Sequence, residues 1–184
     1  MGEAITALLW DLEDFPIPIN GRCLCSFVEN IKSALRDAGY LNDSVTIYVY
    51  SDTKNESPPA FWHEFIHAGI LVRHVGDKHS RVMSMIEDIV LFGRVNRDDY
   101  GSRIGTPKHL IVVSKSIPED PLLVRALEAM KERGYNILLA QHDDHDDYDK
   151  ALPIASDVWL WETLFDGGEP LGPYVTDTDS EEES

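Results

Sequence analysis

The sequence predicts an α/β fold in which a parallel sheet of about five strands is covered by helices on both faces. Short apolar segments rich in β-branched residues alternate with longer segments whose apolar residues recur every three or four positions. The short segments are almost continuously apolar, which is typical of strands buried on both faces of a parallel sheet. The length of 184 residues is enough for one domain with a substantial core.

The first half of the chain supplies three of the expected strands. In order, the expected elements are a strand over 4–10, a helix over 22–38, a strand over 45–51, a helix over 58–68, a strand over 69–75 and a helix over 80–95. Gly39 ends the first helix, because glycine readily adopts the conformation that follows a helix. Pro58 and Pro59 suit the first turn of the second helix, where a missing N–H costs little.

The second half continues the alternation. We expect a strand over 109–114, a helix over 121–135, a strand over 136–141 and a last helix over 155–165. Trp159 and Trp161 would then be two apart on one helix, so only one of them could face the core. The predicted domain spans residues 1–168, and 169–184 are expected to form a disordered acidic tail.

The formal net charge of −17 is concentrated in two places. The segments 142–149 and 176–184 hold five acidic residues each, so 23 acidic residues face 16 basic ones elsewhere in the chain. The remaining surface is therefore moderately acidic. This composition argues against a general nucleic-acid binder, which needs a basic surface to neutralise phosphates.

The sequence gives few signals of cellular location. No apolar run reaches the ~18 residues that span a bilayer, and no signal peptide is evident, so we expect no membrane association. Cys23 and Cys25 are too close in sequence for a favourable disulfide, and we expect reduced thiols. A cytoplasmic location is the expectation, with the nucleus as an alternative.

The stretch TALLWDLEDFPIP, at 6–18, ends an apolar strand with Asp11, Glu13 and Asp14. In parallel sheets, ligands bind outside the carboxyl ends of the strands. These acids could therefore hold a metal ion at the sheet edge. The alternative is that they are ordinary loop residues that end a strand. Glycine-rich phosphate loops are absent, which makes dinucleotide and P-loop sites poor candidates.

Four segments together resemble the NYN domain, a branch of the PIN-like nucleases. The version they resemble is that of the limkain-b, or meiosis regulator and mRNA stability factor, family. The segments are LLWDLEDFPIP (8–18), IEDIVLF (86–92), ALEAMKERGYNILLA (126–140) and ASDVWLWETL (155–164). The resemblance implies a three-layer, Rossmann-like fold with strand order 3-2-1-4-5. It also implies carboxylates that bind Mg²⁺ or Mn²⁺ for RNA cleavage.

Carried over position by position, the resemblance implies that Asp11, Asp88 and Asp120 are the metal-binding and catalytic acids. It places Glu13, Asp14, Ser114 and Lys115 around them. Three departures from the family pattern weaken such a site. Asp14 stands where the family has Asn. The family's acid near the start of the third helix falls at about Val82, and Lys115 and Ser116 stand where the fourth strand should end in an acid.

Two hypotheses follow from the resemblance. The first is a metal-dependent endonuclease acting on single-stranded RNA in post-transcriptional regulation of gene expression. The second is a catalytically inactive module that binds RNA or a protein partner in a regulatory complex, with the metal lost and a cation such as Lys115 replacing it electrostatically. Some relatives are linked with peroxisomes, but the C-terminal EEES is not a peroxisomal targeting signal.

Two further patterns have the composition of metal sites. The stretch HDDHDDYD, with His142 and His145, could bind Zn²⁺ or Ni²⁺, but a solvated loop is the preferred interpretation. His63 and His67 satisfy H-E-x-x-H, yet a zinc peptidase needs a third ligand and a longer helix. We therefore do not expect a zinc site at either place.

Overall fold

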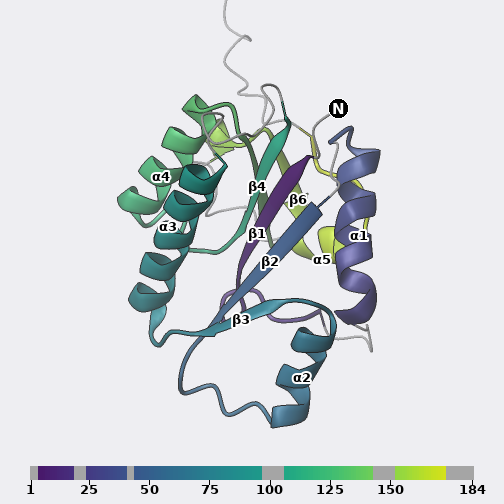
Figure 1. Ribbon diagram of the computed structural model, residues 1–184, viewed down its shortest axis with the longest axis vertical. Helices are drawn as coiled ribbons and strands as arrows, with labels where there is room; N and C mark the ends of the chain where they lie inside the picture. The colour runs from purple at the N-terminus through teal and green to yellow at the C-terminus, as the bar shows by residue number, and fades with distance from the viewer. Residues whose placement is uncertain (1–3, 19–23, 41–43, 97–105, 143–151, 173–184) are drawn as a thin grey trace, which may run out of the picture.

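The computed structural model describes residues 4–18, 24–40, 44–96, 106–142 and 152–172 (Figure 1). Their six strands form one sheet in the order β3-β2-β1-β4-β5-β6, and every neighbouring pair is parallel. The strands are β1 (Ile5–Asp11), β2 (Ser44–Ser51), β3 (Leu71–His74), β4 (Lys108–Val113), β5 (Asn136–Gln141) and β6 (Asp157–Leu160). The predicted α/β class, parallel sheet and 3-2-1-4-5 order are confirmed, with β6 added beside β5.

Helices cover both faces of the sheet, which gives three layers (Figure 1). The helices are α1 (Leu24–Asp37), α2 (Pro59–His67), α3 (Lys78–Val95), α4 (Pro121–Glu132) and α5 (Trp161–Phe165), and η2 (Leu152–Ile154) is a short 3-10 turn. Figure 1 shows α3 and α4 on one side of the sheet and α1 and α5 on the other. Gly39 and Gly134 follow α1 and α4 with φ of +85° and +82°, the conformation that ends helices at glycine.

The C-terminal part of the sheet differs from the expected helix over 155–165. Residues Asp157–Leu160 form β6 and pair with β5, and a helix begins only at Trp161. Trp159 and Trp161 are therefore both buried, at 0% and 2% exposure. Their indole N–H groups donate to the backbone carbonyls of Gly168 and Pro16, each at 3.0 Å. The expectation that only one tryptophan could face the core was wrong, because it assumed helical spacing across a junction between strand and helix.

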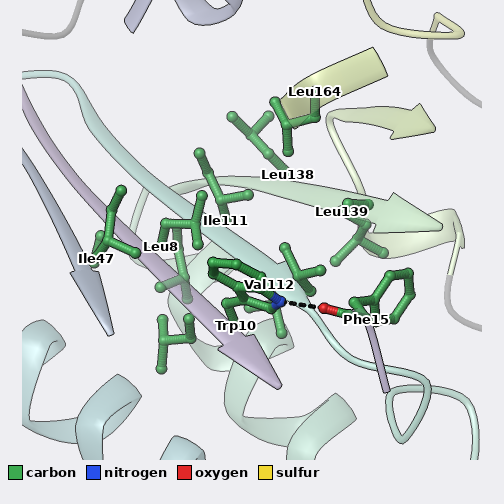
Figure 2. Packing of buried hydrophobic residues seen from close by; sticks show 14 of the residues in the cluster. Leu8, Trp10, Phe15, Ile47, Ile111, Val112, Leu138, Leu139 and Leu164 are labelled. Carbon is green, nitrogen blue, oxygen red and sulfur yellow. Dashed lines mark hydrogen bonds between the residues drawn. The ribbon is translucent and has the colours of Figure 1, made fainter. Parts of the chain in front are cut away.

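Trp10 on β1 lies at the centre of the core between the sheet and the α1 side. Its ring is fully buried, and its centroid lies 5.4 Å from that of Phe27 and 4.9 Å from that of Trp161. The indole N–H donates to the backbone carbonyl of Phe15 at 2.6 Å, as Figure 2 shows. This bond ties the segment after β1 to the core. It thereby fixes where the chain leaves the sheet edge.

Three further findings concern Leu171, Cys25 and the lengths of the helices. The backbone N–H of Leu171 donates to the carbonyl of Val158 at 2.7 Å, so residue 171 lies against β6. Cys25 is disulfide-bonded, contrary to the expected reduced thiol, and Cys23 lies outside the described residues. Within the described ranges, no helix combines the length and apolar character needed to cross a bilayer.

Candidate functional site

The topology of the sheet directs attention to the carboxyl ends of β1 and β4. From these two central strands the chain progresses outward in opposite directions, to β2 and β3 on one side and to β5 and β6 on the other. Such a switch point is where open α/β sheets bind ligands. Asp11 is the last residue of β1, and Ser114 to Ser116 follow directly after β4. These are the same segments in which the sequence placed candidate site residues.

Asp11 is enclosed and paired with an arginine. Its side chain is fully buried, and the Nε atom of Arg81, in the first turn of α3, lies 3.0 Å from both carboxylate oxygens. Arg81 is itself buried, and its Nη1 donates to the backbone carbonyl of Gly76 at 3.2 Å. The Oδ1 atom of Asp11 also accepts the backbone N–H groups of Glu13 (3.1 Å) and Asp14 (3.3 Å). The carboxylate is therefore neutralised by residues of the chain itself.

The electrostatics of Asp11 combine opposing influences. Burial, the largest, and the negative charge of Asp14 raise the pKa of Asp11 above its usual value. The hydrogen bond and positive charge of Arg81 oppose this rise, as does the backbone N–H of Asp14. Desolvation penalises a buried carboxylate strongly, so the charged form depends on Arg81. Arg81 is thus the principal stabilising partner of this acid.

Asp14 connects the end of β1 with the end of β4. Its Oδ2 atom accepts the hydroxyl of Ser114 at 3.3 Å and the backbone N–H of Lys115 at 3.0 Å. The structure thus brings Asp14, Ser114 and Lys115 together. The Lys115 side chain is exposed, and the cation that meets Asp11 is Arg81 rather than Lys115.

Glu13 points to a neighbouring loop. Its Oε1 atom accepts the backbone N–H of Asp52 at 3.0 Å and the side-chain amide of Asn55 at 2.9 Å. Glu13 therefore links the segment after β1 to the segment after β2. This contact holds the two loops together at the carboxyl edge.

Asp88 lies in a separate polar cluster further along α3. Arg73 of β3 contacts it through Nη2 to Oδ1 at 3.0 Å and through Nε to Oδ2 at 2.9 Å. The Tyr50 hydroxyl also donates to Oδ2 at 2.6 Å. Asp88 is seven residues beyond Arg81, which corresponds to about 10 Å along a helix. The structure therefore does not bring Asp88 to Asp11.

The bond from Tyr50 to Asp88 gives a first testable prediction. Burial and the charge of Asp88 raise the pKa of Tyr50, so its hydroxyl remains a donor. Tyr50→Phe should lower the free energy of unfolding by roughly 1–2 kcal/mol, because a buried hydrogen bond to a charged acceptor is lost. Urea unfolding measures this. Tyr48→Phe is the matched control, since it keeps the ring beneath Arg73. Equal effects of the two variants would contradict the role given to the Tyr50 hydroxyl.

Asp120 is the N-cap of α4. Its Oδ1 atom accepts the backbone N–H groups of Leu122 at 2.9 Å and Leu123 at 3.1 Å. This arrangement stabilises a helix start. Asp120 also lines a cavity of about 330 Å³ together with residues from the first turn of α3 and the segment after β4. The three acids expected to bind a metal, Asp11, Asp88 and Asp120, therefore have different partners.

The described residues do not fit a divalent metal. Within the described ranges, no three His, Cys, Asp or Glu side chains are placed to hold an ion together. Mg²⁺ and Mn²⁺ need several oxygen ligands that converge on one point. Asp11 instead faces a guanidinium group, Asp88 pairs with Arg73, and Asp120 caps a helix.

The two other metal-like patterns are placed only in part. The Nε2 atom of His142 lies 3.1 Å from the backbone carbonyl of Asp14, to which it donates, and its ring stacks on Phe15 at 4.2 Å. The rest of HDDHDDYD, His145 included, lies outside the described residues. His63 and His67 are exposed on α2, a helix of nine residues.

The sequence did not identify Arg81 as a site residue. The sequence nevertheless pointed to this place, because the family's acid near the start of this helix was expected at about Val82, the residue after Arg81. A basic residue at that point reverses the charge that a metal site requires. The pairing with Asp11 could not be deduced, because it joins residues 70 positions apart through the packing of α3 on the sheet.

Comparison with known proteins identifies a family for this chain. The family model of the NYN domain matches residues 5–152, which include β1 to β5 and the Asp11–Arg81 pair. No curated protein matches the chain.

Proposed function

This chain belongs to the NYN-domain family, and on that premise we propose that it is a non-cleaving member that acts in an RNA-related process. The family has a PIN-like, nuclease-type fold, and its nucleases generally depend on divalent metal ions. Membership alone would therefore favour an endoribonuclease. The geometry of the carboxyl edge instead favours a domain that retains the fold and binds without cutting.

The observation that carries this proposal is the buried ion pair between Asp11 and Arg81. Both oxygens of Asp11 lie 3.0 Å from Arg81 Nε, and neither side chain is accessible to a ligand from solvent to any large extent. A divalent ion would have to displace this guanidinium and would then find Asp88 and Asp120 held elsewhere. A divalent cation is also repelled by the positive charge of the Arg81 guanidinium group.

The biological setting is part of the same proposal. We propose a role in post-transcriptional regulation of gene expression, in the cytoplasm, with RNA as the ligand and a protein partner as the alternative. The RNA-related character of the family supports the first ligand. The net charge of −17 requires that any RNA contact be local rather than spread over the surface.

The test is cleavage of single-stranded RNA in the presence of Mn²⁺ or Mg²⁺. We expect no metal-dependent cleavage by the wild-type protein, and no difference from Asp11→Asn, because no ion is held at Asp11. We also expect that Mn²⁺ leaves the melting temperature unchanged. Circular dichroism of both proteins checks that the fold is intact.

The contrary result would be cleavage that requires the metal and disappears in Asp11→Asn. It would support the endonuclease hypothesis, with Asp11, Asp88 and Asp120 rearranging to bind the ion. Because a contaminating nuclease would be unaffected by the substitution, the comparison of the two proteins separates these explanations.

A further inference from the structure

The outward face of α3 is less polar than the exposed side of a helix usually is. With α4, this helix forms an outer layer on one side of the sheet (Figure 1). Its opposite side is buried, through residues such as Met85 and Ile89. A helix in this position normally carries charged and polar residues on its outward face. Three apolar side chains lie there in this protein, because Val90, Leu91 and Val95 are 54%, 53% and 71% exposed.

Two residues of opposite charge flank Val90 and Leu91. Glu87 lies about one turn before them and Arg94 about one turn after them, and both are exposed. Residues seven apart share one side of a helix, so the acid, the apolar pair and the base form one line along the outward face. Among the described residues, neither charge has an ion-pair or side-chain hydrogen-bond partner, whereas Asp88, the residue after Glu87, has one. The single chain thus leaves two opposite charges and an apolar pair open to a partner.

The order of these four residues is self-complementary. Glu87 lies as far before the midpoint of the Val90–Leu91 pair as Arg94 lies beyond it. When a second α3 lies antiparallel across a two-fold axis at this midpoint, Glu87 of each copy faces Arg94 of the other. Val90 of each copy then faces Leu91 of the other. In a parallel pair, acid would face acid and base would face base. The charges therefore favour a second copy of this chain, in the antiparallel orientation.

We propose that the outward face of α3 binds a second copy of this chain, which gives a two-fold symmetric dimer with antiparallel α3 helices. One helix from each copy forms the contact, so the interface is smaller than that of a permanent dimer. We therefore expect a dissociation constant on the order of 10 µM. The dimer is independent of the proposed function, because the contact involves neither RNA nor a metal ion.

The antiparallel arrangement keeps the two carboxyl edges apart. α3 begins at the carboxyl edge of the sheet, and Arg81 in its first turn lies roughly 14 Å along the helix from the two-fold axis. The two helices run in opposite directions, so the Asp11–Arg81 pairs of the two copies lie on opposite sides of that axis. Dimer formation therefore leaves both carboxyl edges outside the contact.

The experiment is sedimentation equilibrium of the full chain at about 1–200 µM, a range that brackets the expected dissociation constant. A salt concentration of about 0.15 M screens the repulsion between distant charges on two copies that each carry a net charge of −17. We expect the average mass to rise with concentration from that of one chain toward that of two. A single-chain mass at every concentration would overturn the inference. Assemblies that grow beyond two chains would also overturn it, because a two-fold contact closes at the dimer.

Charge variants test the antiparallel pairing. Glu87→Arg gives the face two positive charges and Arg94→Glu gives it two negative charges, so each variant alone should bind itself at least tenfold more weakly than wild type. An equal mixture of the two should form a mixed dimer with nearly the wild-type affinity, because each copy supplies the charges that the other lacks. Glu64→Arg, at an exposed position on α2, makes the same change in net charge as Glu87→Arg and should leave the dimer unchanged. An intact Glu87→Arg dimer, or no mixed dimer, would refute this pairing.

An apolar variant tests the centre of the contact. Leu91→Gln should raise the dissociation constant at least tenfold, because the lost side chain counts twice in a symmetric dimer. It should leave the melting temperature of the monomer unchanged, because Leu91 is exposed and glutamine is a good helix former. Leu122→Gln, at 54% exposure on α4, is the matched control and should dimerise like wild type. Equal weakening by both variants would overturn the inference. A monomer that Leu91→Gln destabilises would overturn it too, since the face would then be covered within one chain.

Discussion

Arg81→Met is expected to lower the free energy of unfolding by about 3–5 kcal/mol, the range for removing one partner of a buried ion pair. Asp11 has no exposed surface, so its charge would lose its principal stabilising partner and water could not replace it. Methionine retains much of the aliphatic stem and therefore limits the packing change. Urea unfolding followed by circular dichroism provides the measurement.

The double variant Asp11→Asn with Arg81→Met is the decisive control. Asparagine keeps an oxygen that can accept the backbone N–H groups of Glu13 and Asp14 but carries no charge. The double variant should therefore be more stable than Arg81→Met alone. A loss below about 1 kcal/mol in the single variant would show that the pair behaves like an exposed one.

The penalty of Arg81→Met should depend on pH. Burial and Asp14 already raise the folded-state pKa of Asp11, and loss of Arg81 raises it further. A carboxyl group whose pKa is raised in the folded state stabilises the fold most in acid. For Asp11 this stabilisation is fully present below the unfolded-state pKa of about 3.9, and it is lost as the pH rises through the folded-state pKa. Protonation of Asp11 thus substitutes for the guanidinium charge. The difference between variant and wild type should be largest at neutral pH and should shrink in acid.

Trp10→Ala is expected to cost about 3–5 kcal/mol, the range for truncating a large buried aromatic side chain. Its ring contacts four other aromatic residues, and its loss leaves the Phe15 carbonyl without its indole donor. Thermal or urea unfolding measures the effect. Trp10→Phe separates the two contributions, because it restores most of the ring and none of the N–H.

Trp62→Ala is the comparison for this variant. Trp62 is only partly buried on α2 and also donates through its indole N–H, to the carbonyl of Ser57 at 3.2 Å. Its truncation should cost clearly less than that of Trp10. Similar losses for the two tryptophans would contradict the central position assigned to Trp10.

Sequence reasoning succeeded where a single local signal was enough. Continuous apolar runs such as 109–114 predicted buried parallel strands, and Gly39 marked a helix end that the structure reproduces. It failed at Asp157–Leu160, where four residues rich in aromatic and aliphatic side chains are consistent with either strand or helix. Pairing with β5 makes this segment a strand, and that pairing joins residues far apart in the sequence.

The same distinction explains the candidate site. Asp11, Glu13 and Asp14 could be placed at a sheet edge because they follow an apolar strand. Which partner each acid has depends on how helices pack over the sheet, and no spacing in the sequence encodes that Arg81 reaches Asp11. Asp88 illustrates this, since its partners Arg73 and Tyr50 come from two other elements.

The placement of β6 and α5 has a consequence for where this protein can be shortened. The family match ends at residue 152, but β6 covers the edge of β5, and α5 supplies Trp161 and Phe165 to the aromatic group around Trp10. A fragment ending at 152 would expose β5, whose residues 137–141 are all buried, as an unpaired apolar edge open to intermolecular strand pairing. The segment that matches the family model is therefore shorter than the segment that completes the sheet and the aromatic group around Trp10.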